Sequence, residues 1–241
     1  RWDRSALLLG IGIAVKPVPA FMGLLFLAVR PTAQAKLRFF SLAAVPSAVA
    51  SLPFALADVD AFLSAVFGYK SDPLIGWYRF ATALVDVLGV PLLLPSTATV
   101  LSVTKVAVVL SILAVSVWYL YNSRTVSLPR ASLLVICAFY VVSAGVAAQY
   151  LYWAVPLLFL VALPDWFRVA YAVVGVGAAA TRYAFAYAAG LLTDVAGVSG
   201  ESALVVLYVG FSGLFWLVAL AGVYLVLTHG RGSDTPVPSA A

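Results

Sequence analysis

Residues 145–164 read GVAAQYLYWAVPLLFLVALP. The stretch is almost wholly apolar, yet an amide (Gln149), two phenols (Tyr150 and Tyr152) and an indole (Trp153) lie together inside it. With the apolar residues that precede it from position 131, it is longer than one ordinary membrane span of about 20 residues. A turn at this point would decide the side of a membrane on which every later loop lies.

The composition predicts an all-α, polytopic helical membrane protein. Of 241 residues, 64% are hydrophobic and 10% are charged, and the mean hydropathy is +1.09. A soluble domain is about 25% charged. One cysteine, Cys137, and one histidine, His229, cannot form an internal disulfide or a Cys/His zinc site. Nothing implies a cofactor, dependence on a divalent metal stays open, and the net charge of +5 makes no case for nucleic acid.

Apolar runs predict about seven transmembrane helices. They cover residues 5–28, 39–57, 98–121, 131–148, 149–164, 168–190 and 202–228. A stretch at 80–95 is too short for an ordinary span, contains Asp86, and is predicted to be re-entrant or to lie against the membrane. Residues 1–231 are therefore expected to form one transmembrane domain, and 232–241 a disordered cytoplasmic tail.

Basic residues indicate the orientation, because cytoplasmic loops are enriched in them. The loops of one side hold Arg30, Lys36, Arg38, Arg124, Arg130, Arg168 and Arg231 against Asp165 and Asp234. The other side holds Arg1, Arg4, Lys70 and Arg79 against Asp3, Asp58, Asp60, Asp72, Asp194 and Glu201. The first side is predicted to be cytoplasmic, which requires a tight turn near residues 147–149. The four polar and aromatic residues quoted above then lie at the outer surface.

Two interpretations of this aromatic cluster remain open. The rings can form an interfacial belt at the level of the lipid head groups. Alternatively, the cluster can bind a polar ligand. The Gln149 amide can either cap backbone groups of the turn or reach such a ligand.

The predicted outer loop, residues 58–79, has two parts. Asp58 or Asp60 can cap a short helix with an apolar face that lies on the outer leaflet. The following residues, GYKSDPLIGWYR, include Tyr69, Lys70, Asp72 and Arg79. They form either a solvated loop with aromatic anchors or a site for a sugar or phosphate, because rings stack on pyranose faces and cations pair with phosphate.

Three cations lie within or at the edge of apolar segments: Lys16, Lys105 and Arg182. A cation there is a functional hypothesis by default. Lys16 precedes Pro17, and Pro19 follows, so its helix is expected to be broken or kinked. The three cations can pair with structural partners, or they can lean outward and bind an anionic lipid head group.

Three stretches together resemble the GT-C superfamily of polytopic glycosyltransferases, in particular its bacterial and archaeal mannosyltransferase-like branch. GIAVKPVPAFMGLLFLAVRP resembles the Lys-Pro-containing span of that branch, and a basic loop follows it. SLPFALADVDAFLSAVFGY resembles the next span and outer helix. Gln149, Tyr150, Trp153 and Pro156 resemble its Gln-Tyr motif. The resemblance covers most of residues 5–165.

The resemblance implies a hexosyltransferase of the cell envelope, multi-pass in the cell membrane. It would move a sugar, with mannose as a candidate, from a polyprenyl-phosphate donor to an acceptor on the outer face. The reaction would be inverting, and its catalytic aspartate is expected before Arg1, so that this chain would be the C-terminal portion of the enzyme. Asp72 is a candidate supporting group.

The residues expected to bind substrate are drawn from the motifs and buried cations described above. They are Lys16, Tyr69, Lys70, Asp72, Arg79, Gln149, Tyr150, Trp153 and Arg182. Two other classes of function would use the same membrane fold. One is a flippase or transporter for polyprenyl-linked sugars, and the other is a non-catalytic membrane assembly subunit.

Overall fold

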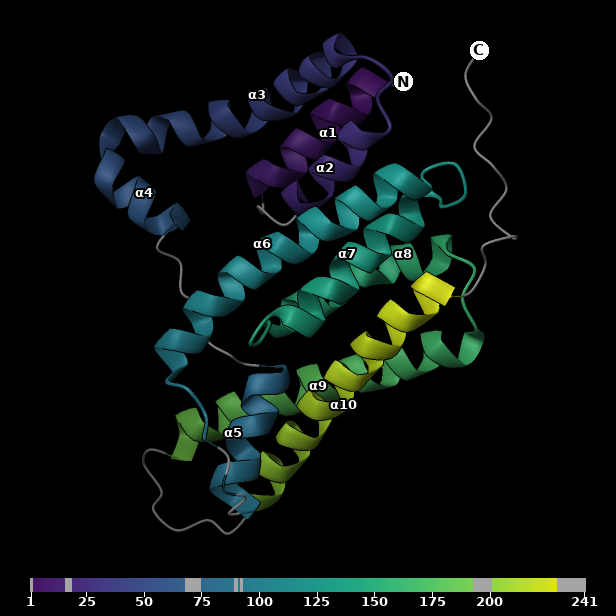
Figure 1. Cartoon of the computed structure of the whole chain (residues 1–241). Helices are drawn as coiled ribbons and strands as arrows, with labels where there is room; N and C mark the ends of the chain where they lie inside the picture. The colour runs from purple at the N-terminus through teal and green to yellow at the C-terminus, as the bar shows by residue number, and fades with distance from the viewer. Residues whose placement is uncertain are drawn as a thin grey trace.

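The computed structural model describes residues 2–15, 19–67, 75–88, 91, 93–192 and 201–228 (Figure 1). Within these residues every regular element is a helix, apart from one isolated β-bridge between Ile75 and Val146. The predicted all-α membrane fold is confirmed. The predicted tail at 232–241 lies outside the described residues.

The chain begins with three helices, α1 (Trp2–Val15), α2 (Ala20–Ala28) and α3 (Ala33–Ala57). The predicted interruption next to the Lys-Pro pair is confirmed, because α1 ends before it and α2 begins after Pro19. The prediction of one crossing helix over 5–28 is wrong. A helix of 14 residues is about 21 Å long, and one of nine residues is shorter still, whereas the hydrocarbon core is about 30 Å thick.

The start of α1 lies beside the basic loop that follows α2. The carboxylate of Asp3 pairs with Arg38 at 2.6 Å, and the Arg30 guanidinium carbon lies 3.5 Å from the centre of the Trp2 ring. The prediction that Arg4 lies on the opposite side from Arg30 and Arg38 is therefore wrong. The physical reason is the break after α1, which brings the end of α2 back to the level where α1 begins.

Helix α3 runs beside α1 in the same direction. Gly10 makes this contact possible, because a Cβ there would lie 2.2 Å from the carbonyl oxygen of Ala43. The Ser47 hydroxyl donates a hydrogen bond to the Gly10 carbonyl at 3.0 Å. Only Phe39 and Ala43 of α3 are buried, so most of this helix faces away from the protein.

The predicted outer loop contains a short helix, α4 (Val59–Phe67), and is followed by α5 (Trp77–Leu88). Asp58 caps α4 as predicted, because its carboxylate accepts a hydrogen bond from the Ala61 amide at 2.9 Å. Helix α5 overlaps the first part of the short apolar stretch predicted at 80–95. With 12 residues it is about 18 Å long, so it is too short to cross a membrane, and it packs against the last helix of the chain.

The middle of the chain forms α6 (Thr97–Asn122), α7 (Leu128–Val142), the 3₁₀ helix η1 (Ala148–Ala154) and α8 (Val155–Leu160). Helix α6 agrees with the predicted span at 98–121 to within one residue. The predicted turn between two apolar segments is confirmed, but it begins earlier, at Ser143. The second segment is not one α-helix. Pro156 lacks an amide hydrogen, and the chain changes from 3₁₀ to α geometry beside it.

The last two helices, α9 (Asp165–Leu192) and α10 (Glu201–Thr228), complete the fold. Helix α10 packs against α5, α7 and α9, and Figure 1 shows it beside them. Small residues allow these contacts. A Cβ at Gly213 would meet the Phe80 ring of α5 at 2.7 Å, and one at Gly222 would meet Cys137 of α7 at 2.9 Å. Close approach at small residues is a common way for membrane helices to pack.

Three helices of the described residues are long and apolar enough to cross a membrane by length and composition: α3, α6 and residues 204–228 of α10. The segments α7 and η1–α8 are apolar but shorter. The protein is therefore a membrane protein, and the number of about seven crossings stays a prediction.

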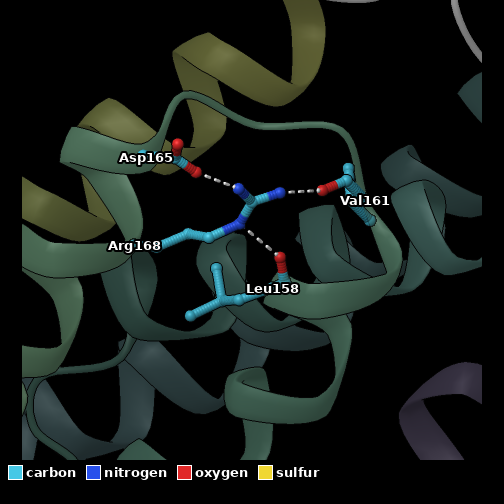
Figure 2. Close-up of polar contacts among 4 residues, drawn as sticks. All are labelled: Leu158, Val161, Asp165 and Arg168. Atoms are coloured by element: carbon cyan, nitrogen blue, oxygen red, sulfur yellow. Dashed lines mark hydrogen bonds and ion pairs between the residues drawn. The ribbon is translucent and has the colours of Figure 1, made fainter.

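Two buried or half-buried arginines join the helix ends on the predicted cytoplasmic side. Nε and Nη2 of Arg130 donate hydrogen bonds to the Val226 carbonyl near the end of α10, at 2.9 and 2.6 Å. Figure 2 shows Arg168 donating to the carbonyls of Leu158 and Val161 and pairing with Asp165. Cations at C-terminal carbonyls complement the helix macrodipole. The start of α7, the end of α8, the start of α9 and the end of α10 thus lie at one end of the bundle.

Candidate functional site

The turn after α7 joins the predicted outer loop directly. The amide of Ile75 donates to the Val146 carbonyl at 3.2 Å, and the amide of Val146 donates to the Ile75 carbonyl at 2.7 Å. The Tyr78 amide donates to the Ala144 carbonyl at 3.3 Å. Two segments predicted separately to be external are therefore adjacent, which agrees with their placement on one side.

Gly76 makes this junction possible. Its φ is +150°, and a Cβ at this position would lie 3.0 Å from the Cα of Gly145. Ser143–Val146 are buried without being helical, and such backbone is tolerated at membrane depth when protein groups satisfy it. The Ser143 hydroxyl supplies one more bond, to the Gly145 carbonyl at 2.9 Å.

The aromatic residues of η1 form a packed cluster with neighbouring helices. The rings of Tyr150 and Trp153 lie 4.2 Å apart, and both lie 6.4 Å from the ring of Phe139 on α7. Phe21 of α2 extends the cluster, with its ring 5.5 Å from that of Phe139. Tyr150 and Trp153 are half-buried, whereas Tyr152 is 57% exposed. Of the three, Tyr152 has the exposure expected of a belt residue.

Two tyrosines outside the predicted site position η1. The hydroxyl of Tyr140 on α7 donates to the Tyr150 carbonyl, and the hydroxyl of Tyr171 on α9 donates to the Leu151 carbonyl. Both rings pack edge-on against Phe215 of α10. Neither residue was identified from the sequence. The signal that could have found them is the hydroxyl itself, because a buried tyrosine in an apolar helix usually finds a hydrogen-bond partner.

Gln149 is exposed, and it makes no hydrogen bond with the described residues. The backbone groups of the turn are bonded to Ser143, Ile75 and Tyr78 instead. The Gln149 amide therefore does not cap the backbone of the turn. Two interpretations remain for Gln149, which are a position at the surface and a contact with a ligand.

Two predicted cations lie near one buried tyrosine on α10. The guanidinium carbon of Arg79, on α5, lies 5.6 Å from the centre of the Tyr208 ring. Arg182, on α9, also interacts electrostatically with Tyr208. Both arginines are half-buried, and neither belongs to the ion pairs that link Asp3 to Arg38 and Asp165 to Arg168. Their chemistry suits an anion, because a guanidinium offers planar, paired donors to phosphate.

The hydrogen bond from the Tyr78 amide to the Ala144 carbonyl, here called the clamp, links Arg79 to the turn before η1, since Arg79 is the next residue along α5. The Tyr78 hydroxyl also donates to the Pro95 carbonyl at 3.0 Å, at the start of α6. The start of α5, the start of α6 and the end of α7 thus meet at one end of the bundle. Lys105 is exposed on α6. Four predicted residues lie outside the described residues: Lys16, Tyr69, Lys70 and Asp72.

Two cavities lie among the described helices. One, of about 290 Å³, adjoins η1, α8 and α9 and is lined by Tyr152, Arg168, Tyr171 and apolar residues. The other, of about 280 Å³, lies among α1, α2 and α3. The side chains described here include no group of three or more His, Cys, Asp or Glu residues that could bind a metal ion.

The sequence profile of glycosyltransferase family 87 matches residues 1–145. The chain belongs to this family. Its membership confirms the resemblance to GT-C membrane glycosyltransferases, and it identifies the protein as a membrane glycosyltransferase. No curated protein and no solved structure matches the chain.

The matched region ends inside the turn, at Gly145. It includes Arg79 and the loop segment that is clamped to the turn, but Gln149, Tyr150, Trp153 and Arg182 follow it. The structure nevertheless joins the two parts, since helices α9 and α10 of this glycosyltransferase pack against α5 and α7. The unmatched part is therefore part of the same bundle as the matched one.

Proposed function

We propose that this glycosyltransferase moves a hexose from a polyprenyl-phosphate donor to an acceptor on the outer face of the cell membrane, with mannose as the first sugar to test. The observation that carries the proposal is the position of Arg79, 5.6 Å from the centre of the Tyr208 ring, with Arg182 in electrostatic range of the same tyrosine, at the bundle end that also bears the Gln149 turn. Family membership supports the type of reaction.

The two arginines have the chemistry for the leaving group. When the bond from the anomeric carbon to the phosphate oxygen breaks, negative charge grows on the phosphate. Fixed cations in a partly dry environment stabilise such charge more strongly than water does. Because Arg79 and Arg182 come from different helices, their spacing depends on the packing of α5 and α9 on α10.

The η1 cluster has the chemistry for the sugar. The half-buried rings of Tyr150 and Trp153 pack against each other with centres 4.2 Å apart, and a pyranose can stack on the exposed part of this pair. The exposed Gln149 amide can donate to or accept from a sugar hydroxyl. The hydrogen bonds from the Tyr140 and Tyr171 hydroxyls hold the backbone of η1 in place, so the aromatic pair is positioned before a sugar binds.

An inverting transfer also needs a carboxylate to take the proton of the acceptor hydroxyl. Three described carboxylates are already engaged: Asp3 pairs with Arg38, Asp58 caps α4, and Asp165 pairs with Arg168. The proposal therefore assigns binding roles to this region and leaves the general base to another residue.

The test is transfer by the full-length protein in proteoliposomes, with radiolabelled polyprenyl-phosphate mannose as donor and parallel reactions with other hexoses. Arg79→Gln and Arg182→Gln should each lower kcat by about a hundredfold, the size seen when one stabilising donor is lost. Arg124→Gln is the matched control, because it removes an exposed cation at the other end of the bundle. Normal transfer in both arginine variants would contradict the assignment.

The η1 cluster is tested in the same assay. Gln149→Asn shortens the side chain by one methylene and should lower transfer about a hundredfold, because a small misplacement has effects of this order. Tyr150→Phe should reduce transfer if the hydroxyl contacts the sugar. Tyr152→Phe, at the exposed neighbour, should be nearly silent. Full activity of the Gln149 and Tyr150 variants would indicate that the cluster is an interfacial belt and does not bind the sugar.

The same vesicles separate the two other classes of function. Movement of labelled donor across the bilayer without any transfer would indicate a flippase or transporter. Neither transfer nor movement, in protein shown to be folded, would favour a non-catalytic assembly subunit. Either result would overturn the proposal.

A further inference from the structure

Arg30, between α2 and α3, is only 5% exposed although it carries a charge. Its guanidinium lies between two rings, with the guanidinium carbon 3.5 Å from the centre of the Trp2 ring and 4.7 Å from that of Phe39. Nε and Nη2 are enclosed and make no hydrogen bond. Nη1 makes none with the described residues either, but it is not enclosed. Arg30 therefore has one guanidinium nitrogen, Nη1, that a ligand can reach, and this side of the group is here called its free edge.

The surroundings of Arg30 favour an anion. Burial deprives the Arg30 charge of the solvation that water would supply, and this lowers the pKa of Arg30. Arg4, Lys36 and Arg38 are exposed on the neighbouring ends of α1 and α3, and the acidic residue Asp3 is already paired with Arg38. Helix α3 begins at residue 33, so the positive end of its macrodipole also lies close in the chain.

An apolar cavity adjoins this charged position. The cavity of about 280 Å³ among α1, α2 and α3 is lined by Leu9, Gly23, Leu24, Leu27, Phe39 and Ser47, among others. Phe39 belongs both to this lining and to the ring pair around Arg30, so the cavity lies next to the guanidinium, with the Phe39 ring shared between them. A charged edge beside an apolar groove matches a molecule with a phosphate at one end and a hydrocarbon chain at the other.

We propose that the junction of α1, α2 and α3 binds one anionic phospholipid, with its phosphate on the free edge of Arg30 and an acyl chain in the adjoining groove. The groove is what favours a lipid over free phosphate, which has no apolar part. Helices α1 and α3 expose many apolar side chains, so the groove belongs to a surface that faces lipid. The proposal does not depend on the sugar, the donor or the reaction proposed above.

The first experiment compares the full-length protein in nanodiscs of phosphatidylcholine with protein in nanodiscs that also contain phosphatidylglycerol. After transfer to detergent, native mass spectrometry counts the retained phosphatidylglycerol, and thermal unfolding gives the Tm. Wild-type protein should retain one molecule and show a higher Tm with it. Arg30→Gln should retain at least about tenfold less, as expected for the loss of a hydrogen bond to a charged group. Arg124→Gln should behave like the wild type.

The second variant fills the groove and keeps Arg30. A Cβ at Gly23 meets no atom within 4 Å, so Gly23→Leu can be introduced without a clash at its base. It should lower lipid retention while the protein remains folded. Gly175→Leu is the matched control, since Gly175 also has open space around its Cβ but lines the cavity beside α9.

Inorganic phosphate separates the two sources of the anion. We expect phosphate alone to leave the Tm of the wild type unchanged at constant ionic strength. A rise in Tm with phosphate that Arg30→Gln abolishes and Gly23→Leu preserves would identify a site for a soluble anion and overturn the lipid assignment. Equal lipid retention by wild type, Arg30→Gln and Gly23→Leu would overturn the site altogether.

Discussion

Helices α3 and α7 are both apolar, but the protein uses them in opposite ways. Of the 25 residues of α3 only two are buried, Phe39 and Ala43, whereas nine of the 15 residues of α7 are buried. Helix α7 packs against α6, α8 and α10, while α3 packs mainly against α1. Apolar composition therefore does not tell a lipid-facing helix from a protein-facing one. Lipid tails are as apolar as leucine, so burial against protein has no hydrophobic advantage there.

What distinguishes the two regions is the polar and small residues at their contacts. Helix α7 buries Arg130 and Ser132, and its Tyr140 bonds to η1. Trp216 of α10 donates to the Val141 carbonyl at 3.1 Å. The contact of α3 with α1 has a close approach at Gly10, one hydroxyl bond from Ser47 and an ion pair between Asp3 and Arg38 that is exposed to solvent. The N-terminal helices should accordingly be the less stable part of the molecule.

The largest expected effect is all-or-none and concerns the side on which α1 begins. In a background with Cys137→Ala, Arg4→Cys should react like Arg124→Cys and unlike Gln149→Cys with an impermeant thiol reagent in intact cells. We expect labelling of the Gln149 variant alone, because the contacts of Trp2 and Asp3 hold the start of α1 beside Arg30 and Arg38. Labelling of Arg4→Cys without permeabilisation would contradict this fold-back and support a single crossing helix over residues 5–28.

Phe215→Ala should give the largest loss of stability. Phe215 is 1% exposed and contacts both Tyr140 and Tyr171, so its truncation leaves a cavity and loosens the support of η1. The free energy of unfolding in detergent should fall by about 3 kcal/mol. Phe54→Ala, at a 69% exposed ring on α3, should change it by less than about 0.5 kcal/mol. Equal losses of unfolding free energy in the two variants would contradict the difference in burial between α3 and the α7–α10 region.

Gly10→Ala should have an intermediate effect that is confined to the N-terminal helices. The new Cβ would meet the backbone of Ala43 at 2.2 Å, and backbone cannot move aside as a side chain can. Overpacking of this kind costs about 1–3 kcal/mol. Gly23→Ala, with open space around its Cβ, should be neutral or slightly stabilising. Hydrogen exchange read by mass spectrometry should show faster exchange in α1 and α3 and unchanged exchange in α7.

Gly76→Ala is expected to have the smallest of these effects on stability, and it should act at the junction with η1. The φ of +150° is unfavourable for alanine, and the Cβ would press on Gly145, so a cost of about 1–2 kcal/mol is expected. Gly210→Ala, which has no close neighbour, is the control. If the clamp positions Arg79, the Gly76 variant should also lose transfer activity. Full activity at reduced stability would show that the clamp stabilises the junction but does not position Arg79 for transfer.

Local chemistry explains why several features could be predicted from the sequence. Asp58 caps α4 because a carboxylate before a helix satisfies amides within the same few residues. Helix α6 agrees with its prediction because an uninterrupted apolar run has one local solution in a membrane. The turn before Gln149 followed from the basic residues of later loops. Membership of the GT-C glycosyltransferases followed from the succession of three motifs.

Other features depend on contacts between segments distant in the chain, which no local pattern encodes. The fold-back of α1 onto the level of Arg30 needs both the break before α2 and the pairing with α3. Two features arise only when α5, α7, α9 and α10 pack together: the support of η1 by Tyr140 and Tyr171, and the placement of Arg79 and Arg182 near Tyr208. The sequence by itself determined which segments are helical and apolar, because backbone bonding in lipid is satisfied locally. Only the tertiary structure decided which of their faces meet, because in lipid that choice rests on packing and a few polar bonds.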